Sequence, residues 1–183
     1  THYDVTLNPT TEVLPLMGSK EGVMHLSMAY LNPGDQVLIP NPGYPTYNSV
    51  TRLMEAEVVL YDLKEYNDWQ PDFNALELLD TSRVKIMWLN YPHMPTGSDV
   101  SIKTFDQLIK WAKERSILLV NDNPYSFILT EKPKSILSRP GAMDVAVELN
   151  SLSKSFNMAG WRIGMLSGKA EVLQEALKVK NNI

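Results

Sequence analysis

The sequence predicts an α/β fold: a three-layer α/β/α sandwich around a seven-stranded, mostly parallel sheet with one antiparallel strand. Short runs rich in Val, Ile and Leu are apolar nearly throughout, which is typical of strands covered on both faces. Stretches of helical period separate these runs, and such alternation favours parallel strands joined by right-handed crossovers. The last connection, from Asn150 to Arg162, is too short for a helical crossover, so the final strand is expected to run antiparallel.

Seven apolar runs are the expected strands. In chain order they are Val13–Met17, Gln36–Pro40, Glu57–Leu63, Val84–Asn90, Ile117–Asn121, Val145–Asn150 and Arg162–Ser167. Three of the intervening stretches carry clear helix signals. The first is the apolar stripe Val23, Leu26 and Tyr30, which stops at a turn sequence over residues 32–35. The other two follow helix-start signals, which are Pro71-Asp72 and the N-cap residue Ser101.

Length and composition restrict the function classes. The 183 residues suit one domain, and the formal net charge of −4 lacks the basic excess of a nucleic-acid binder. The absence of cysteine excludes disulfides, thiolate metal sites and cysteine nucleophiles. No apolar run approaches the roughly 18–20 residues of a membrane span. Because the chain starts at Thr1 with neither a signal peptide nor an initiator Met, we expect it to be a piece of a longer protein.

Ligands of open parallel sheets gather at the carboxyl ends of the strands, so the residues that follow each strand are the candidate site. Residues 18–22, Gly-Ser-Lys-Glu-Gly, follow the first strand and open a helix whose N–H groups can bind an anion. A tight strand-to-helix turn is the alternative. Residues 41–47, Asn-Pro-Gly-Tyr-Pro-Thr-Tyr, follow the second strand and offer an aromatic face to a flat ligand. The alternative is a turn with packed tyrosines.

Charged residues follow the fifth and sixth strands. Asp122 comes directly after an apolar strand, so it should be partly buried and need a cationic or protonated partner. Lys154 lies among small hydroxyl residues, with Arg162 eight positions on, which suits an amine nucleophile beside an anion site. Taken singly, Lys154 and Arg162 would be solvated charges. Their placement at one sheet edge with Asp122 and Tyr125 favours a site.

Three motifs resemble those of the class I/II aminotransferases, the fold-type I enzymes that depend on pyridoxal 5′-phosphate (PLP). They are Ser-Leu-Ser-Lys-Ser-Phe (151–156) with Gly-Trp-Arg-Ile-Gly (160–164), Asp-Asn-Pro-Tyr (122–125) and Pro-Thr-Gly (95–97). The resemblance runs in order through nearly the whole chain. It implies that Lys154 holds PLP as a Schiff base and then shuttles a proton, and that Asp122 accepts the pyridine N–H. It also implies that Tyr125 donates to the phenolic oxygen and that Tyr44 stacks on the ring.

The same resemblance implies a phosphate site that begins at Gly18. Its members would be the N–H groups of Ser19 and Lys20, the hydroxyls of Ser151 and Ser153, and Arg162. No metal belongs to the site that the resemblance implies.

One position departs from the family pattern. An Asn commonly precedes Pro-Thr-Gly in this family and donates to the phenolic oxygen, but Met94 stands here, and its thioether is at best a weak acceptor. The loss of one donor is expected to raise the pKa of the Schiff base. The adjacent His93 is a candidate substitute donor, and a loop histidine that faces solvent is the alternative.

The resemblance covers the large, cofactor-binding domain of the family, residues 1–183, whereas family members are about twice this length. The N-terminal arm and the C-terminal small domain, which carries the arginine for the substrate carboxylate, are absent from this sequence. We therefore expect the chain to bind PLP but to transaminate weakly or not at all. For the full-length protein we expect a cytoplasmic homodimer acting on an amino acid and a 2-oxo acid, on the aspartate, alanine or LL-diaminopimelate side of the family.

Three other functions stay open at this point. A PLP lyase or decarboxylase uses the same scaffold, because the cofactor site alone does not fix which Cα bond breaks. The PLP-binding effector domain of a transcription regulator is an alternative outside the enzymes. A nucleotide-binding doubly wound domain is disfavoured, because both the Gly-x-Gly-x-x-Gly fingerprint and a Walker lysine are missing.

Overall fold

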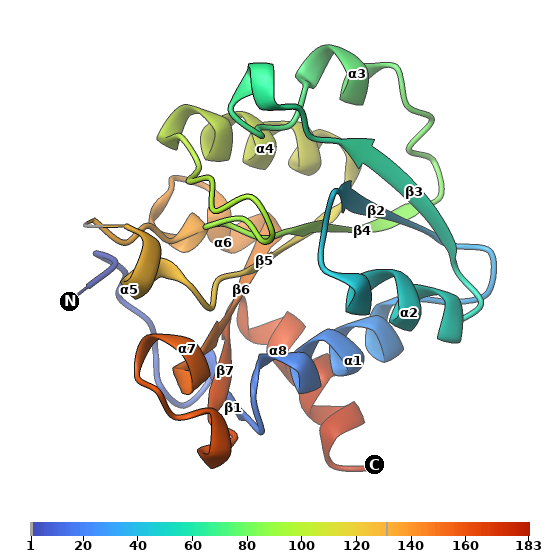
Figure 1. Ribbon diagram of the computed structural model, residues 1–183. Helices are drawn as coiled ribbons and strands as arrows, with labels where there is room; N and C mark the ends of the chain where they lie inside the picture. Colours follow the sequence, from blue (N-terminus) through green and yellow to red (C-terminus); the bar gives the residue numbers. More distant parts are fainter. Residues whose placement is uncertain (1, 131) are drawn as a thin grey trace.

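A mixed sheet forms the middle of three layers in the computed structural model, which describes residues 2–130 and 132–183 (Figure 1). The described residues form seven strands in the order β1-β7-β6-β5-β4-β2-β3. Their bounds are Val13–Leu16 (β1), Gln36–Asn41 (β2), Glu57–Asp62 (β3), Val84–Leu89 (β4), Leu118–Asp122 (β5), Ala146–Ser151 (β6) and Gly164–Gly168 (β7). Strand β7 pairs antiparallel with both β1 and β6, and the other ladders are parallel. The predicted fold class and the single antiparallel strand are confirmed.

Helices cover both faces of the sheet (Figure 1). On one face lie α1 (Ser19–Tyr30), α2 (Pro45–Leu53) and α8 (Ala170–Lys180), and on the other lie α3 (Phe73–Glu77), α4 (Ile102–Arg115) and α6 (Ala142–Val145). Two short helices, α5 (Ser126–Leu129) and α7 (Leu152–Ser155), follow β5 and β6 at the carboxyl-end edge. Three 3₁₀ turns, η1 (Glu65–Asn67), η2 (Ile136–Ser138) and η3 (Ala159–Trp161), complete the described elements.

The two sides of the sheet bury separate apolar cores. In β4, Met87 and Leu89 pack in the core under α4, while Ile86 and Trp88 pack in the core under α1 and α2. This alternation follows from the two-residue period of a strand, and it explains why these strands read as continuous apolar runs.

Local signals fix the helix ends that the sequence predicts. The Ser101 hydroxyl accepts a hydrogen bond from the Thr104 N–H at 3.0 Å and so caps α4, and Asp72 caps α3 through the N–H groups of Asn74 and Ala75. Helix α3 ends at Glu77, so it is a single short turn. No helix within residues 2–130 and 132–183 is long and apolar enough to cross a membrane.

Candidate functional site

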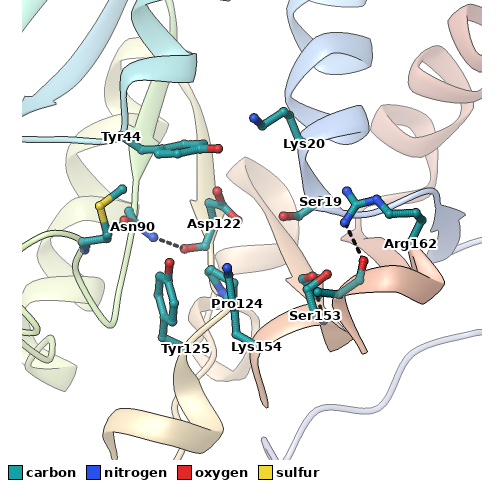
Figure 2. Close-up of a pocket in the computed structure, with 13 residues that line it drawn as sticks. Ser19, Lys20, Tyr44, Asn90, Asp122, Pro124, Tyr125, Ser153, Lys154 and Arg162 are labelled. Carbon is teal, nitrogen blue, oxygen red and sulfur yellow. Dashed lines mark hydrogen bonds between the residues drawn. The ribbon is translucent and has the colours of Figure 1, made fainter. Parts of the chain in front are cut away.

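A cavity of about 280 Å³ opens at the carboxyl-end edge of the sheet, where the residues that follow β1, β2, β4, β5 and β6 meet (Figure 2). Nine of the ten residues proposed from the sequence line it: Ser19, Lys20, Tyr44, Asp122, Tyr125, Ser151, Ser153, Lys154 and Arg162. They come from segments far apart in the chain, and the parallel strands bring them together. The sequence prediction that they share one edge of the sheet is therefore confirmed.

The tenth residue, Gly18, lies behind the cavity wall. It has φ +85°, and a Cβ placed on it would lie 2.4 Å from Nη2 of Arg162. Glycine is therefore the residue that lets the guanidinium pack against the start of α1. Arg162 is held there by the bond from its Nη1 to the Ala159 carbonyl at 3.1 Å. Gly164 makes a similar close approach, since its Cβ would lie 2.8 Å from the Ser19 nitrogen.

This corner of the cavity is built for an anion. Helix α1 starts with no side-chain cap, which leaves the first N–H groups of the helix for a ligand, and the helix dipole places positive potential there. The hydroxyl residues Ser151 and Ser153 also line the cavity, and the Ser151 oxygen accepts from the Ser153 N–H at 3.2 Å. Together with the Arg162 guanidinium these donors suit a phosphate.

Asp122 lies at the floor of the cavity and is 5% exposed. Its Oδ2 accepts a hydrogen bond from the Tyr47 hydroxyl at 2.9 Å, whereas its Oδ1 is buried without a hydrogen-bond partner. Burial raises the pKa of Asp122 to about 6, and the charge of Glu148 adds to that rise, whereas the hydrogen bond from Tyr47 and the nearby Ser19 oppose it. Tyr47 is therefore a protonated partner for one oxygen of Asp122, and the other oxygen still lacks the partner that its burial requires.

Aromatic and amine groups face one another across the cavity. Figure 2 shows the Tyr44 ring on one side, with the Lys154 amine and the Tyr125 hydroxyl pointing toward it from the other. The Lys20 ammonium lies 5.6 Å from the Tyr44 ring centroid. Burial raises the pKa of Tyr125, and the nearby Asp122 adds to the rise. The pKa of Tyr44 is lowered, because hydrogen bonds with Thr46 and Lys20 outweigh its burial.

The loop after β4 corrects both expectations for His93. This residue is 1% exposed, and its Nδ1 and Nε2 lie 2.8 Å from the Thr96 hydroxyl and 3.1 Å from the Pro42 carbonyl. It does not line the cavity, so it is neither a substitute donor nor a solvent-facing loop residue. Met94 does line the cavity, at the position where the family commonly has Asn.

Sequence reasoning missed two residues of the site. The side-chain amide of Asn90 lines the cavity, donates to the Asp122 carbonyl at 2.7 Å and accepts from the Met94 N–H at 3.0 Å (Figure 2). Its signal was a polar residue directly after a buried strand. Tyr47 lies three residues after Tyr44 in the same aromatic stretch, but nothing local distinguishes a tyrosine that bonds to a carboxylate from one that only packs.

The charges of the cavity favour an anionic ligand. Three cationic side chains, Lys20, Lys154 and Arg162, line it together with the single carboxylate Asp122. In the part of the chain that the structure describes, no three His, Asp or Glu residues are grouped so that they could hold a metal.

Known proteins share this sequence and fold. The chain is 45% identical over 183 residues to the LL-diaminopimelate aminotransferase of Aquifex aeolicus and 43% identical to that of Dehalococcoides mccartyi, covering 99% of this chain and 47% of each relative. It spans about half the length of the curated relatives it matches.

Solved structures of similar proteins have the same fold as this chain. Substrate-bound BacF from Bacillus subtilis superimposes with a TM-score of 0.94 at 39% identity, covering 100% of this chain and 47% of that one. An aminotransferase from Staphylococcus aureus superimposes with a TM-score of 0.91 at 34% identity, covering 98% and 48%. The sequence profile of the family "Aminotransferase class I and II" matches residues 1–183. The chain belongs to the class I and II aminotransferase family.

Proposed function

We propose that residues 1–183 are the cofactor-binding large domain of a PLP-dependent aminotransferase, which exchanges an amino group between an amino acid and a 2-oxo acid. PLP is the cofactor of the family to which the chain belongs. One observation carries the proposal: a buried carboxylate oxygen of Asp122 without a partner shares a cavity with an anion-binding corner and the Lys154 amine.

The residues present fit the cofactor on the structure's own terms. A buried carboxylate oxygen without a partner is unfavourable unless a donor reaches it, and a protonated pyridine nitrogen is such a donor. At the opposite end, Gly18 leaves room that a Cβ would fill, and there Arg162 meets the start of α1. A ring nitrogen and a phosphate at opposite ends of one flat molecule match these two features.

Each side chain then has a defined task. Asp122 binds the ring nitrogen and keeps it protonated, while Arg162 and the hydroxyls of Ser151 and Ser153 bind the phosphate with the N–H groups of Ser19 and Lys20. Tyr44 packs on the ring face, and Tyr125 donates to the phenolic oxygen. When bound, the cofactor supplies an electron sink for carbanion chemistry at the substrate Cα.

Lys154 is the proposed nucleophile. Its amine would hold the cofactor covalently at the aldehyde carbon, with loss of water, and the free amine would hold and move the proton of the substrate Cα.

The group that binds the substrate carboxylate is proposed to lie outside this chain. Besides Arg162, no arginine of the described residues lines the cavity. Arg83, Arg115 and Arg139 pair with Glu57, Glu77 and Asp106, and the Nε of Arg52 donates to Asn48. We therefore expect the 183-residue chain to bind PLP yet to transaminate weakly or not at all. Robust turnover by this chain alone would contradict that expectation.

The substrate, assembly and location are proposals for the whole protein. The names of the relatives support LL-diaminopimelate as the first amino donor to test. We further propose that the whole protein is a cytoplasmic homodimer without nucleic-acid or membrane partners. The mild acidity of residues 1–183 supports the lack of a nucleic-acid partner.

Reductive trapping tests the cofactor site. The chain is incubated with PLP, reduced with borohydride and digested, and mass spectrometry then locates the modified lysine. A pyridoxyl group on Lys154, absent from Lys154→Ala, is the expected result; modification of other lysines alone would overturn the proposal.

A second experiment tests the reaction of the full-length protein. Amino acids are screened by loss of the absorbance band of the lysine-bound cofactor. Formation of the 2-oxo acid without ammonia or CO₂ distinguishes transamination from lyase or decarboxylase chemistry.

A further inference from the structure

Tyr47 is a buried side chain with a single polar contact to the site. It is 0% exposed, and its ring stacks on Trp88 of β4 with centroids 4.8 Å apart and planes 4° apart. It also makes a T-shaped contact with the Tyr44 ring, with centroids 5.5 Å apart and planes at 78°. This packing fixes the phenol, so its hydroxyl has one fixed position, 2.9 Å from Oδ2 of Asp122.

The direction of that hydrogen bond is fixed as well. Burial raises the pKa of Tyr47 well above its ordinary value, and the charge of Asp122 raises it further. The phenol therefore stays protonated and is the donor of the hydrogen bond. Oδ2 of Asp122 is therefore occupied, and Oδ1 has no partner. One oxygen of this carboxylate is thus bonded to the protein core, and the other is left for a donor from the cavity that Asp122 lines.

We propose that Tyr47 is a positioning residue that holds one oxygen of Asp122 and so presents the other to the ring nitrogen of the bound cofactor. The inference rests on the proposed function, because it assumes that a pyridine ring occupies the cavity. Tyr47 does not line the cavity, so it acts through Asp122 alone.

Loss of the Tyr47 hydroxyl has two physical consequences. Oδ2 loses its phenol donor, so the carboxylate is free to rotate away from the ring nitrogen. The ionised form also loses a hydrogen bond that favours it, so Asp122 is more readily protonated and accepts less well from a ring N–H. Tyr47→Phe keeps the stacked ring and removes only the hydroxyl.

Tyr61 offers a matched control. It is also buried, and its hydroxyl donates to a backbone carbonyl, that of Trp88, at 2.6 Å. Tyr61→Phe therefore removes a buried phenol hydroxyl from the same region of the sheet without touching Asp122.

The affinities of two ligands distinguish a positioning role of Tyr47 from a general effect on stability. Pyridoxamine 5′-phosphate carries the ring nitrogen but cannot bond covalently to Lys154, and its analogue with CH in place of the ring nitrogen lacks only that donor. Dissociation constants of both are measured by fluorescence titration of the 183-residue chain and of Tyr47→Phe and Tyr61→Phe, after thermal melts show that each variant is folded.

Tyr47→Phe is expected to raise the dissociation constant of pyridoxamine 5′-phosphate by about tenfold, which corresponds to one hydrogen bond to a charged group. The dissociation constant of the analogue is expected to stay unchanged. Tyr61→Phe is expected to affect neither ligand. Equal weakening of both ligands, or equal behaviour of the two variants, would overturn the role of Tyr47 and leave the proposed function intact. Absence of binding by the wild-type chain would overturn both.

Discussion

Nη2 of Arg162 occupies the space in which a Cβ of residue 18 would stand, and the two atoms would be 2.4 Å apart. The corner that is proposed to bind the phosphate thus depends on the lack of a side chain at Gly18. Gly18 also has φ +85°, a conformation that L side chains rarely adopt. Backbone conformation and close approach therefore demand glycine at the same position.

Gly18→Ala is expected to displace the guanidinium of Arg162. The affinity for pyridoxamine 5′-phosphate should then fall by about tenfold, because a charge-assisted contact to the phosphate is lost. Gly34→Ala is the matched control, because Gly34 has the same φ of +85° but nothing within 4 Å of its Cβ position. Both variants should lose on the order of 1–3 kcal/mol of stability to backbone strain. Titration calorimetry that finds the two variants binding equally well would refute the dependence on Arg162.

The pKa of Asp122 predicts a pH-dependent stability difference. Burial raises this pKa from its ordinary 3.8 to about 6, so the contribution of Asp122 to the stability of the unliganded chain falls as the pH rises from about 4 through 6. Asp122→Asn cannot ionise. Its free energy of unfolding, relative to the wild type, is therefore expected to increase over that range by on the order of 2–3 kcal/mol.

Urea unfolding of both proteins at pH 4.5 and pH 7.5 measures this difference. The variant keeps every other group in the environment of Asp122, which are Ser19, Tyr44, Tyr47, Tyr125, Glu148 and the cavity cations. A difference that is the same at the two pH values would show that Asp122 titrates normally.

With Met94 in place of the usual Asn, the pKa of the lysine–cofactor linkage is expected to be raised. Asn90 cannot replace a donor at this position, because its amide already binds the Asp122 carbonyl and the Met94 N–H. Met94→Asn is expected to add a donor to the phenolic oxygen and to lower the pKa of the lysine–cofactor linkage by about one unit, as one hydrogen bond to a charged group would. Absorbance titrated against pH in the full-length enzyme measures it, with Met94→Leu as the control. Coincident pKa values for Met94→Asn and the wild type would contradict the prediction.

Ser101 predicts a stability effect remote from the site. Its hydroxyl caps α4, so Ser101→Ala should reduce the free energy of unfolding by about 1 kcal/mol and leave cofactor binding unchanged. Chemical denaturation checks the stability, and Ser82→Ala serves as the surface control, since Ser82 lies in a loop that starts no helix. An unchanged midpoint for Ser101→Ala would rule out the cap as a source of stability.

Sequence patterns were enough to predict the strands, the single antiparallel strand and the set of residues at the strand ends. These features depend on spacing within short segments, such as the apolar runs and the glycine before α1, and such spacing is visible without a structure. The structure confirms that Lys154, Asp122 and their neighbours line one cavity, while their roles in it stay predictions.

The hydrogen-bond partners of these residues could not be predicted from the sequence, because they depend on how distant segments pack together. Tyr47 and Asp122 are 75 positions apart and meet because β2, which leads into α2, lies two strands from β5 in the sheet order. The same packing buries His93 against Pro42 and commits Asn90 to a backbone carbonyl. Hydrogen bonds between segments depend on the order of strands, and that order is set by packing over the whole chain, which no local pattern encodes.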